Sequence, residues 1–450
     1  MTDVVDVVVI GLGPGGEDVA GKLAEAGLEV VGVERQLVGG ECPYWGCVPS
    51  KMMFRAGTLL AEAGRVREMA GEVDVRPDYA PVAARIRDEA TDHWNDQVAV
   101  DRLVSKGGRF VRGAARITGP REVSVDGETF VARRGVVVAT GTVPSVPPVP
   151  GLAETPYWTN RQAIEAKEPP ESLIVLGGGA IGVELAQVFA RFGARVTVLE
   201  AADQLLPLEE PEAGGLIADT LMAEGIDVRV GAQASGVSHG PPFRVEVGAG
   251  VVTTDQLLVA TGRRADLSEL GLDRLGVDGS ARWLATDDRM RVVDGLWAVG
   301  DITGQGAFTH VAMYQSDVAV RAILEQAGRA ARYHAVPRVT FSDPEVGAVG
   351  LTQAQARDQG LRVRVGVAQV PASARGWIHK TGNGGFVKLV EDADRGVLVG
   401  ATSAGPAGGE VLGALSVAVH AELETATLRT MIYAYPTFHR AIEDALKALA

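Results

Sequence analysis

The chain contains only two cysteines, Cys42 and Cys47, and four residues separate them. Two thiols this close can form a disulfide that opens and closes, which makes a two-electron redox couple. A closed zinc site needs four ligands, and the seven histidines of the chain are scattered. Two inert core thiols are a further alternative, but Gly46 and Pro49 interrupt a segment where a core helix prefers continuous helix formers. The spacing therefore favours a reactive pair.

A dinucleotide-binding pattern precedes the cysteines. An apolar run predicts a strand, and residues 18–26 after it predict a helix. Between them, Gly11 permits a tight turn, Gly13 lets a pyrophosphate approach the backbone, and Gly16 allows the helix to pack closely on the strand. A second apolar run ends in Glu34, eighteen residues after Gly16, where a carboxylate can bind ribose hydroxyls.

The same pattern occurs a second time. The apolar runs 172–176 and 195–199 predict two strands, and Glu200 follows the second of them. The turn and helix start between the strands contain Gly177, Gly179 and Gly182. Two complete sites imply two different dinucleotides. Glu200 would accept a hydrogen bond from a ribose 2′-hydroxyl and repel a 2′-phosphate, and residues 201–204 contain no arginine, so the second site favours NADH over NADPH.

Further motifs follow in a fixed order, and together they resemble the class I pyridine nucleotide-disulfide oxidoreductases. This is the group of lipoamide dehydrogenase and of the glutathione, mycothione and mercuric reductases. The resemblance covers nearly the whole chain and rests on the two fingerprints and on the segments 39–51, 138–141, 259–263, 296–301 and 336–347.

The resemblance implies an α/β fold with two Rossmann-like nucleotide-binding domains, one for FAD and one for NAD, and a C-terminal α+β dimerisation domain. The expected segments are 1–150 for the first part of the FAD domain with the cysteines, 151–265 for the NAD domain, 266–330 for the second part of the FAD domain, and 331–450 for the dimerisation domain. Residues 52–106 are expected to be a helical excursion before the chain returns to the sheet at 109–116. A homodimer is implied.

The resemblance also implies the cofactor contacts. Those expected for FAD are Gly11, Gly13, Gly16, Glu34, Gly141 and Asp301, and those for NADH are Gly177, Gly179, Gly182, Glu200 and Gly262.

The implied activity is FAD-dependent NADH:disulfide or dithiol oxidoreduction. In the family, the second cysteine faces the flavin as a charge-transfer thiolate, here Cys47, and the first exchanges with substrate, here Cys42. Lys51 is the local cation, and the family pairs this lysine with the glutamate of the second fingerprint, here Glu184.

The C-terminus departs from the family pattern. The family has a histidine where this chain has Tyr435, and a glutamate where it has Arg440. Helical spacing would make His439 and Glu443 neighbours, so that His439 could replace the missing base with Glu443 orienting it. A solvated helix histidine is the alternative. Tyr435 could supply a hydroxyl, but a phenol is a poor base at neutral pH.

Departures around the cysteines put the substrate in doubt. Glu41 stands where the family has threonine, and a carboxylate beside Cys42 would disfavour a thiolate there. Glutathione reduction is thereby weakened, and mercuric reduction is disfavoured because no cysteine follows Cys47. Two alternatives remain open: a flavin-dependent reductase of a quinone or other non-thiol acceptor, and an FAD-binding redox sensor or partner-binding subunit with weak turnover.

Composition excludes some partners. With 43 basic and 57 acidic residues, the net charge is −14, which disfavours binding to nucleic acid or to an anionic membrane. No apolar run approaches the ~18 residues of a spanning helix, and the N-terminus carries no basic segment before its apolar run. The chain is therefore expected in the cytoplasm, where a disulfide is more often catalytic than structural.

Overall fold

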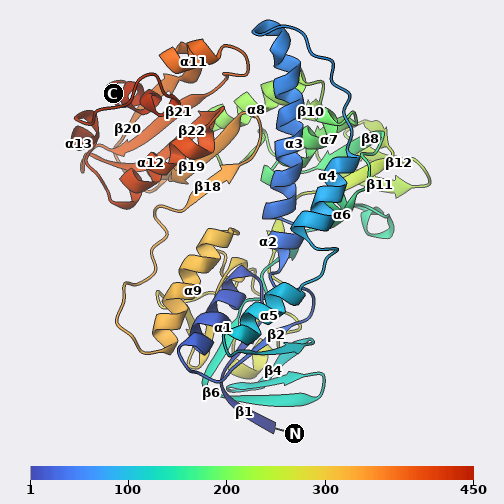
Figure 1. Ribbon diagram of the computed structural model, residues 1–450, viewed down its shortest axis with the longest axis vertical. Coiled ribbons are helices and arrows are strands. Elements are labelled where there is room, and N and C mark those ends of the chain that lie inside the picture. The colour runs from blue at the N-terminus through green and yellow to red at the C-terminus, as the bar shows by residue number, and fades with distance from the viewer. Residues whose placement is uncertain (1, 450) are drawn as a thin grey trace. The chain divides into compact units, whose positions relative to one another are not determined.

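The computed structural model describes residues 2–449, and the chain forms two compact units (Figure 1). The first unit consists of Met1–Pro49, Ala84–Ser145 and Arg263–Tyr333. The second consists of Ser50–Ala83, Val146–Gly262 and His334–Ala450. Each unit is built from segments distant in sequence, so the chain passes between the units several times.

The first unit contains a large sheet with strand order β16-β17-β6-β1-β2-β3. All neighbours on this path are parallel except β16 and β17. The hairpin β4-β5 joins the sheet through antiparallel pairing of β5 with β6. The strands are β1 (Thr2–Ile10), β2 (Val30–Glu34), β3 (Arg109–Arg112), β4 (Ala115–Gly119), β5 (Glu122–Val125), β6 (Glu128–Val138), β16 (Arg291–Val293) and β17 (Leu296–Ala298).

The valine-rich centre of this sheet is buried on both faces, as parallel strands covered by other layers require. Valines of β1 enter two separate apolar clusters, one on each face. Apolar side chains of α1 and α9 complete one of them. The helices of the unit are α1 (Pro14–Glu25), α2 (Glu41–Tyr44), α5 (Gln97–Ser105) and α9 (Thr309–Ile323), and α3 (Cys47–Arg65) begins in it.

The second unit contains a smaller parallel sheet with order β10-β9-β8-β14, beside an antiparallel sheet β11-β12-β13. Helix α7 (Ala180–Arg191) follows β8 directly, and α8 (Pro211–Ala223) precedes β10. The strands are β8 (Ser172–Leu176), β9 (Arg195–Leu199), β10 (Asp227–Arg229), β11 (Ala234–His239), β12 (Phe243–Val247), β13 (Gly250–Thr254) and β14 (Gln256–Val259).

The C-terminal part of the second unit is a five-stranded antiparallel sheet with order β18-β19-β22-β21-β20. Helices α12 and α14 pack their apolar side chains on this sheet. The elements are β18 (Pro337–Thr340), β19 (Glu345–Gly350), α10 (Gln353–Asp358), β20 (Val363–Gln369), α11 (Ala374–His379), β21 (Phe386–Asp392), β22 (Val397–Gly405), α12 (Gly408–His420), α13 (Thr425–Arg429) and α14 (Ala441–Lys447).

The fold class predicted from the sequence is confirmed: two parallel α/β sheets carry the two fingerprints, and an α+β layer follows. The predicted strands 172–176 and 195–199 are present with those bounds. The helical excursion is less continuous than predicted. Helix α3 ends at Arg65, a 3₁₀ turn (Val66–Glu68) and then an irregular stretch follow, and α4 (Ala80–Arg85) begins fifteen residues after Arg65.

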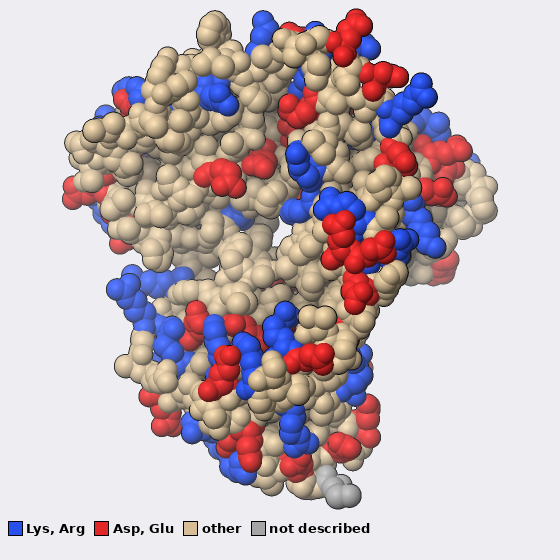
Figure 2. All heavy atoms as spheres, in the orientation of Figure 1, with Lys and Arg blue, Asp and Glu red and all other residues tan. Residues whose placement is uncertain are grey.

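Surface charge is mixed on the face shown in Figure 2, where acidic and basic side chains alternate within each unit. Exposed charged side chains form close ion pairs in both units, such as Arg133 with Glu29 and Arg362 with Asp394. In residues 2–449, no helix has both the length and the apolar character needed to cross a membrane.

Candidate active site

The two cysteines lie at the ends of adjacent helices in the first unit. Cys42 is in the short helix α2 and is half-buried, whereas Cys47 is exposed and is the first residue of α3. A hydrogen bond between the two sulfurs and burial raise the pKa of the Cys42 thiol above its usual range. The N-terminus of α3 favours a negative charge at Cys47.

The first fingerprint forms the turn between β1 and α1. No side chain caps α1 after Gly13, and Pro14 has no N–H group, so the N–H groups available for an anion are those of the following residues of the first turn. A Cβ at Gly16 would lie 2.0 Å from the carbonyl oxygen of Gly11, so only glycine fits there. At the end of β2, Glu34 accepts hydrogen bonds from the N–H groups of Leu12 (2.8 Å) and Gln36 (2.7 Å).

The second fingerprint has the same glycine contact and the same two backbone hydrogen bonds to its carboxylate as the first. Gly179 caps α7 without a side-chain partner, and a Cβ at Gly182 would lie 1.9 Å from the carbonyl oxygen of Gly177. Glu200 accepts hydrogen bonds from the N–H groups of Gly178 (2.5 Å) and Ala202 (2.7 Å). Both turns thus combine uncapped helix N–H groups with a fixed carboxylate, which fits the pyrophosphate and ribose of a dinucleotide.

Other predicted flavin contacts converge in the first unit. Gly141 lies in the turn after β6, and the hydroxyl of its neighbour Thr142 donates to Asp301 at 3.2 Å. Burial raises the pKa of the Asp301 carboxyl, and nearby Arg263 opposes that shift. Arg263 also donates to the Thr142 hydroxyl and carbonyl, both at 2.8 Å. Gly262, predicted for the second site, lies in the turn after β14 of the second unit.

The negative charge of Glu41, next to Cys42 in the sequence, is compensated by Arg263. Its carboxylate lies 3.6 Å from the Arg263 guanidinium, and both side chains are largely buried. The expectation that this carboxylate disfavours a thiolate is weakened accordingly, because an opposite charge offsets its field.

Lys51 and Glu184 are in contact in the second unit. The Lys51 ammonium donates to Glu184 at 2.8 Å and lies 4.5 Å from the ring centroid of Phe341. The Phe341 N–H donates to the other carboxylate oxygen at 2.9 Å. Burial raises the pKa of Glu184, and Lys51 and this N–H counteract it. The loop at Phe341 thus holds both members of the ion pair.

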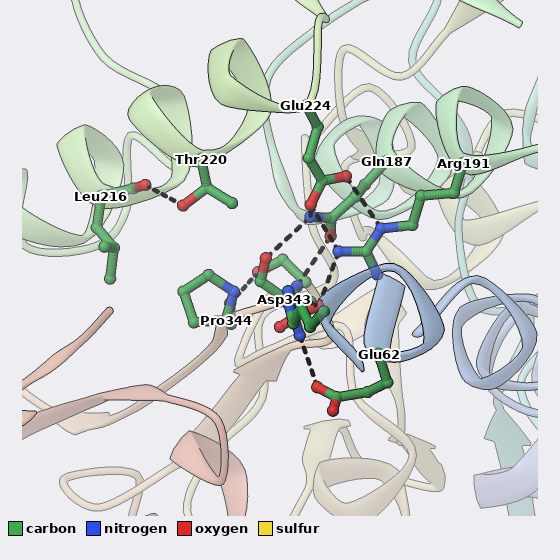
Figure 3. Close-up of polar contacts among 10 residues, drawn as sticks. Glu62, Gln187, Arg191, Leu216, Thr220, Glu224, Asp343 and Pro344 are labelled. Atoms are coloured by element: carbon green, nitrogen blue, oxygen red, sulfur yellow. Dashed lines mark hydrogen bonds and ion pairs between the residues drawn. The ribbon is translucent and has the colours of Figure 1, made fainter. Parts of the chain in front are cut away.

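A polar stripe along α7 extends from this pair. Glu184, Gln187 and Arg191 follow one another at helical spacing, and each binds the segment 341–343. Figure 3 shows Arg191 between Glu224 and Asp343. Arg191 makes two hydrogen bonds to Glu224, at 2.6 and 3.0 Å, and one to Asp343 at 2.8 Å.

The C-terminal candidates are arranged differently from the prediction. Helix α14 begins only at Ala441, so His439 precedes it, in a short 3₁₀ turn, and does not share a helical face with Glu443. His439 contacts the Thr437 hydroxyl at 3.3 Å.

Glu443 has other partners. It pairs with Arg440 (2.9 Å) and Lys447 (2.7 Å), which lower the pKa of its carboxyl. The structure does not bring the Glu443 carboxylate to His439; it pairs that carboxylate with the two cations instead. Tyr435 is exposed, with Arg440 stacked on its ring at 5.5 Å.

Three contacts at the site involve residues that were not predicted from the sequence: Thr309 at the cysteines, Arg263 at Glu41, and Phe341 at Lys51. Thr309 is 262 residues from Cys47, so no local pattern connects them. The one sequence feature that marked Thr309 was its position at the start of the helix that follows the Asp301 motif.

Residues 5–316 match the family model described as pyridine nucleotide-disulphide oxidoreductase, and residues 336–446 match the model of its dimerisation domain. The dihydrolipoyl dehydrogenase of Thermus scotoductus is 32% identical over 464 residues, covering 99% of this chain and 97% of that protein. A mercuric reductase of Bacillus cereus is 31% identical over 453 residues, covering 98% and 71%.

Among solved structures, the copper(II) complex of the HOCl-induced flavoprotein disulfide reductase RclA from Escherichia coli superimposes with a TM-score of 0.87. The sequence identity is 26%, and 99% of each chain is covered. The chain belongs to the pyridine nucleotide-disulphide oxidoreductase family. It is an FAD-dependent oxidoreductase that uses a nicotinamide dinucleotide.

Proposed function

We propose that the chain transfers electrons from NADH through FAD to the Cys42–Cys47 disulfide and from there to a disulfide or dithiol substrate. The observation that supports this most strongly is the sulfur pair itself. Two hydrogen-bonded thiols, one of them at a helix N-terminus, lie in the same unit as the first nucleotide fingerprint. When bound, FAD would supply two-electron transfer between nicotinamide and the disulfide.

The raised pKa of the Cys42 thiol supports different roles for the two cysteines. Cys42 keeps its proton through its hydrogen bond and its burial, so Cys47 is the thiolate that faces the flavin. Cys42 is then the sulfur that exchanges with substrate. Exposure alone does not assign these roles, because Cys47 is the more exposed of the two.

The nicotinamide dinucleotide at the second site is NADH. Both oxygens of Glu200 are held by backbone N–H groups, so the carboxylate stays at the position of the ribose hydroxyls. Arg229, on the neighbouring strand β10, is engaged with Asp227 at 2.6 Å and does not offset this charge. A 2′-phosphate would therefore meet an uncompensated carboxylate.

An anaerobic titration with NADH, followed by a screen of acceptors, tests the function. We expect long-wavelength absorbance after one equivalent of NADH, and turnover with a cyclic or linear disulfide but not with a quinone or Cu(II). We also expect kcat/KM for NADH to exceed that for NADPH by about tenfold or more, because charge repulsion of ~1.4 kcal/mol has that effect. Turnover with a quinone alone, or slow turnover with every acceptor, would replace the proposal with one of the two alternatives.

A proton must still be exchanged with Cys42, and we propose His439 for this role rather than Tyr435. An imidazole titrates near neutral pH, whereas a phenol does not. We expect His439→Gln to reduce disulfide turnover by roughly 10²-fold and to remove one limb of its pH profile, and Tyr435→Phe to change it little. An unchanged profile in His439→Gln would make it an ordinary surface histidine, and a loss confined to Tyr435→Phe would transfer the role to the phenol.

We further propose a homodimer that forms through the C-terminal part of the second unit. Several large apolar side chains there are exposed, including Ile432 (99%) and Trp377 (76%), together with Tyr435. They lie within the match to the dimerisation domain, at residues 336–446. Contact with a second copy of the chain would remove this apolar surface from water. A cytoplasmic location suits a thiol pair that must be reduced in each cycle, and the acidic net charge argues against nucleic acid or an anionic membrane as partner.

A further inference from the structure

The hydroxyl of Thr309 lies at the sulfur pair. Its Oγ1 is 3.5 Å from the Cys47 sulfur, within hydrogen-bonding distance for sulfur. The same hydroxyl interacts with Cys42, since it opposes the rise in the pKa of that thiol. Thr309, Cys42 and Cys47 all belong to the first unit. One side chain thus reaches both reacting atoms.

The backbone around Thr309 reinforces the effect of the hydroxyl. Thr309 is the first residue of the fifteen-residue helix α9, and the capping residue Phe308 makes no side-chain hydrogen bond to it. The first turn of α9 therefore presents partial positive charge on the side of Thr309, and the N-terminus of α3 does so at Cys47. The contact at 3.5 Å therefore joins the first residue of α9 to the first residue of α3.

We propose that Thr309 is the hydrogen-bond donor that stabilises the Cys47 thiolate, a role that rests on the proposed function. When two electrons from NADH cleave the Cys42–Cys47 bond, one proton ends on the Cys42 sulfur and Cys47 leaves as a thiolate. The Thr309 hydroxyl donates to that thiolate and keeps its own proton. In the oxidised pair the Cys47 sulfur carries no charge, so the hydrogen bond from Thr309 to this sulfur is strongest in the reduced state.

Charged groups on the neighbouring elements have partners of their own. On α2, Glu41 is paired with Arg263. On α3, Lys51 is paired with Glu184. On α9, His310 stacks on Phe308 with a centroid distance of 5.2 Å. The hydroxyl is therefore the neutral donor whose contact with the sulfur can be removed without removing a charge.

The test compares Thr309→Val, which keeps the shape and loses the hydroxyl, with Thr309→Ser, which keeps the hydroxyl. The long-wavelength absorbance of the NADH-reduced, FAD-loaded protein is followed against pH. We expect Thr309→Val to need a pH about one unit higher for half-maximal absorbance, since one hydrogen bond to a charged group is lost. We expect Thr309→Ser to match the unmodified protein.

A second readout separates this proposal from the proposed function. In a Cys42→Ser background, the rate of iodoacetamide alkylation of Cys47 is measured against pH, which requires neither NADH nor an acceptor. The same upward displacement in Thr309→Val supports the role of the hydroxyl even where no disulfide turns over. Equal midpoints for the Thr309→Val/Cys42→Ser protein and for Cys42→Ser alone in this assay would overturn it.

Discussion

Replacing Cys47 with serine should abolish both disulfide turnover and the long-wavelength absorbance that NADH produces in the unmodified protein. A serine hydroxyl forms no disulfide with Cys42, and it is not ionised at neutral pH to donate electron density to a flavin. Because the covalent step is lost, we expect turnover to fall below about one-thousandth of the original. The measurement is an anaerobic NADH titration by absorbance, followed by a steady-state assay with the best disulfide.

Cys42→Ser is the matched control, because the two variants have the same composition and differ only in which sulfur remains. It should lose turnover equally but retain a thiolate at Cys47, so we expect the long-wavelength absorbance in the oxidised, FAD-loaded variant before any NADH is added. FAD content, measured for both proteins, shows that the site is intact. If the band survives in Cys47→Ser and disappears in Cys42→Ser, the assignment of the two sulfurs is reversed.

The sequence was sufficient for the parts of the site that local patterns determine. Strand, glycine turn, helix and carboxylate follow each other within about thirty residues in both fingerprints. The two copies fold identically, down to the paired N–H bonds of Glu34 and Glu200. Gly16 and Gly182 were predictable for the same reason, since the turn itself leaves no room for a Cβ.

Long-range contacts were not predictable from one sequence. Thr309 reaches Cys47 only because the strand β17 returns the chain to the first sheet and α9 starts next to it. The structure does not contain the predicted contact between His439 and Glu443. The helix begins two residues after His439, and Arg440 and Lys447 form ion pairs with Glu443. Helical spacing identifies which residues are able to meet, but it does not rank competing partners.

Asp343 shows the same limit in the polar stripe of α7. Nothing in the segment 341–344 indicates that its carboxylate binds Arg191 of α7 and Arg65 of α3 at once, both at 2.8 Å. The arrangement connects three segments of the second unit that lie far apart in sequence. Loss of its central arginine should therefore destabilise that unit.

We expect Arg191→Met to reduce the free energy of unfolding by about 3 kcal/mol, the lower end of the range for breaking a buried ion pair. The Arg191 side chain is only 6% exposed, and its removal leaves Glu224 without its bidentate partner. The cost stays at the lower end because Arg65 still holds Asp343 and Gln187 still donates to Glu224. For a unit of this size the melting temperature should fall by roughly 6–12 °C, measured by calorimetry at fixed FAD loading.

Arg229→Met is the matched control for that measurement. Arg229 also makes two hydrogen bonds to one carboxylate, that of Asp227, but its side chain is 44% exposed. An exposed pair of this kind contributes about 1 kcal/mol or less, because water solvates both charges once they separate. Arg191→Lys should fall between the two, since it keeps the charge and loses the planar fork that Glu224 binds. Equal melting temperatures for Arg191→Met and Arg229→Met would mean that the network around Asp343 does not stabilise the second unit.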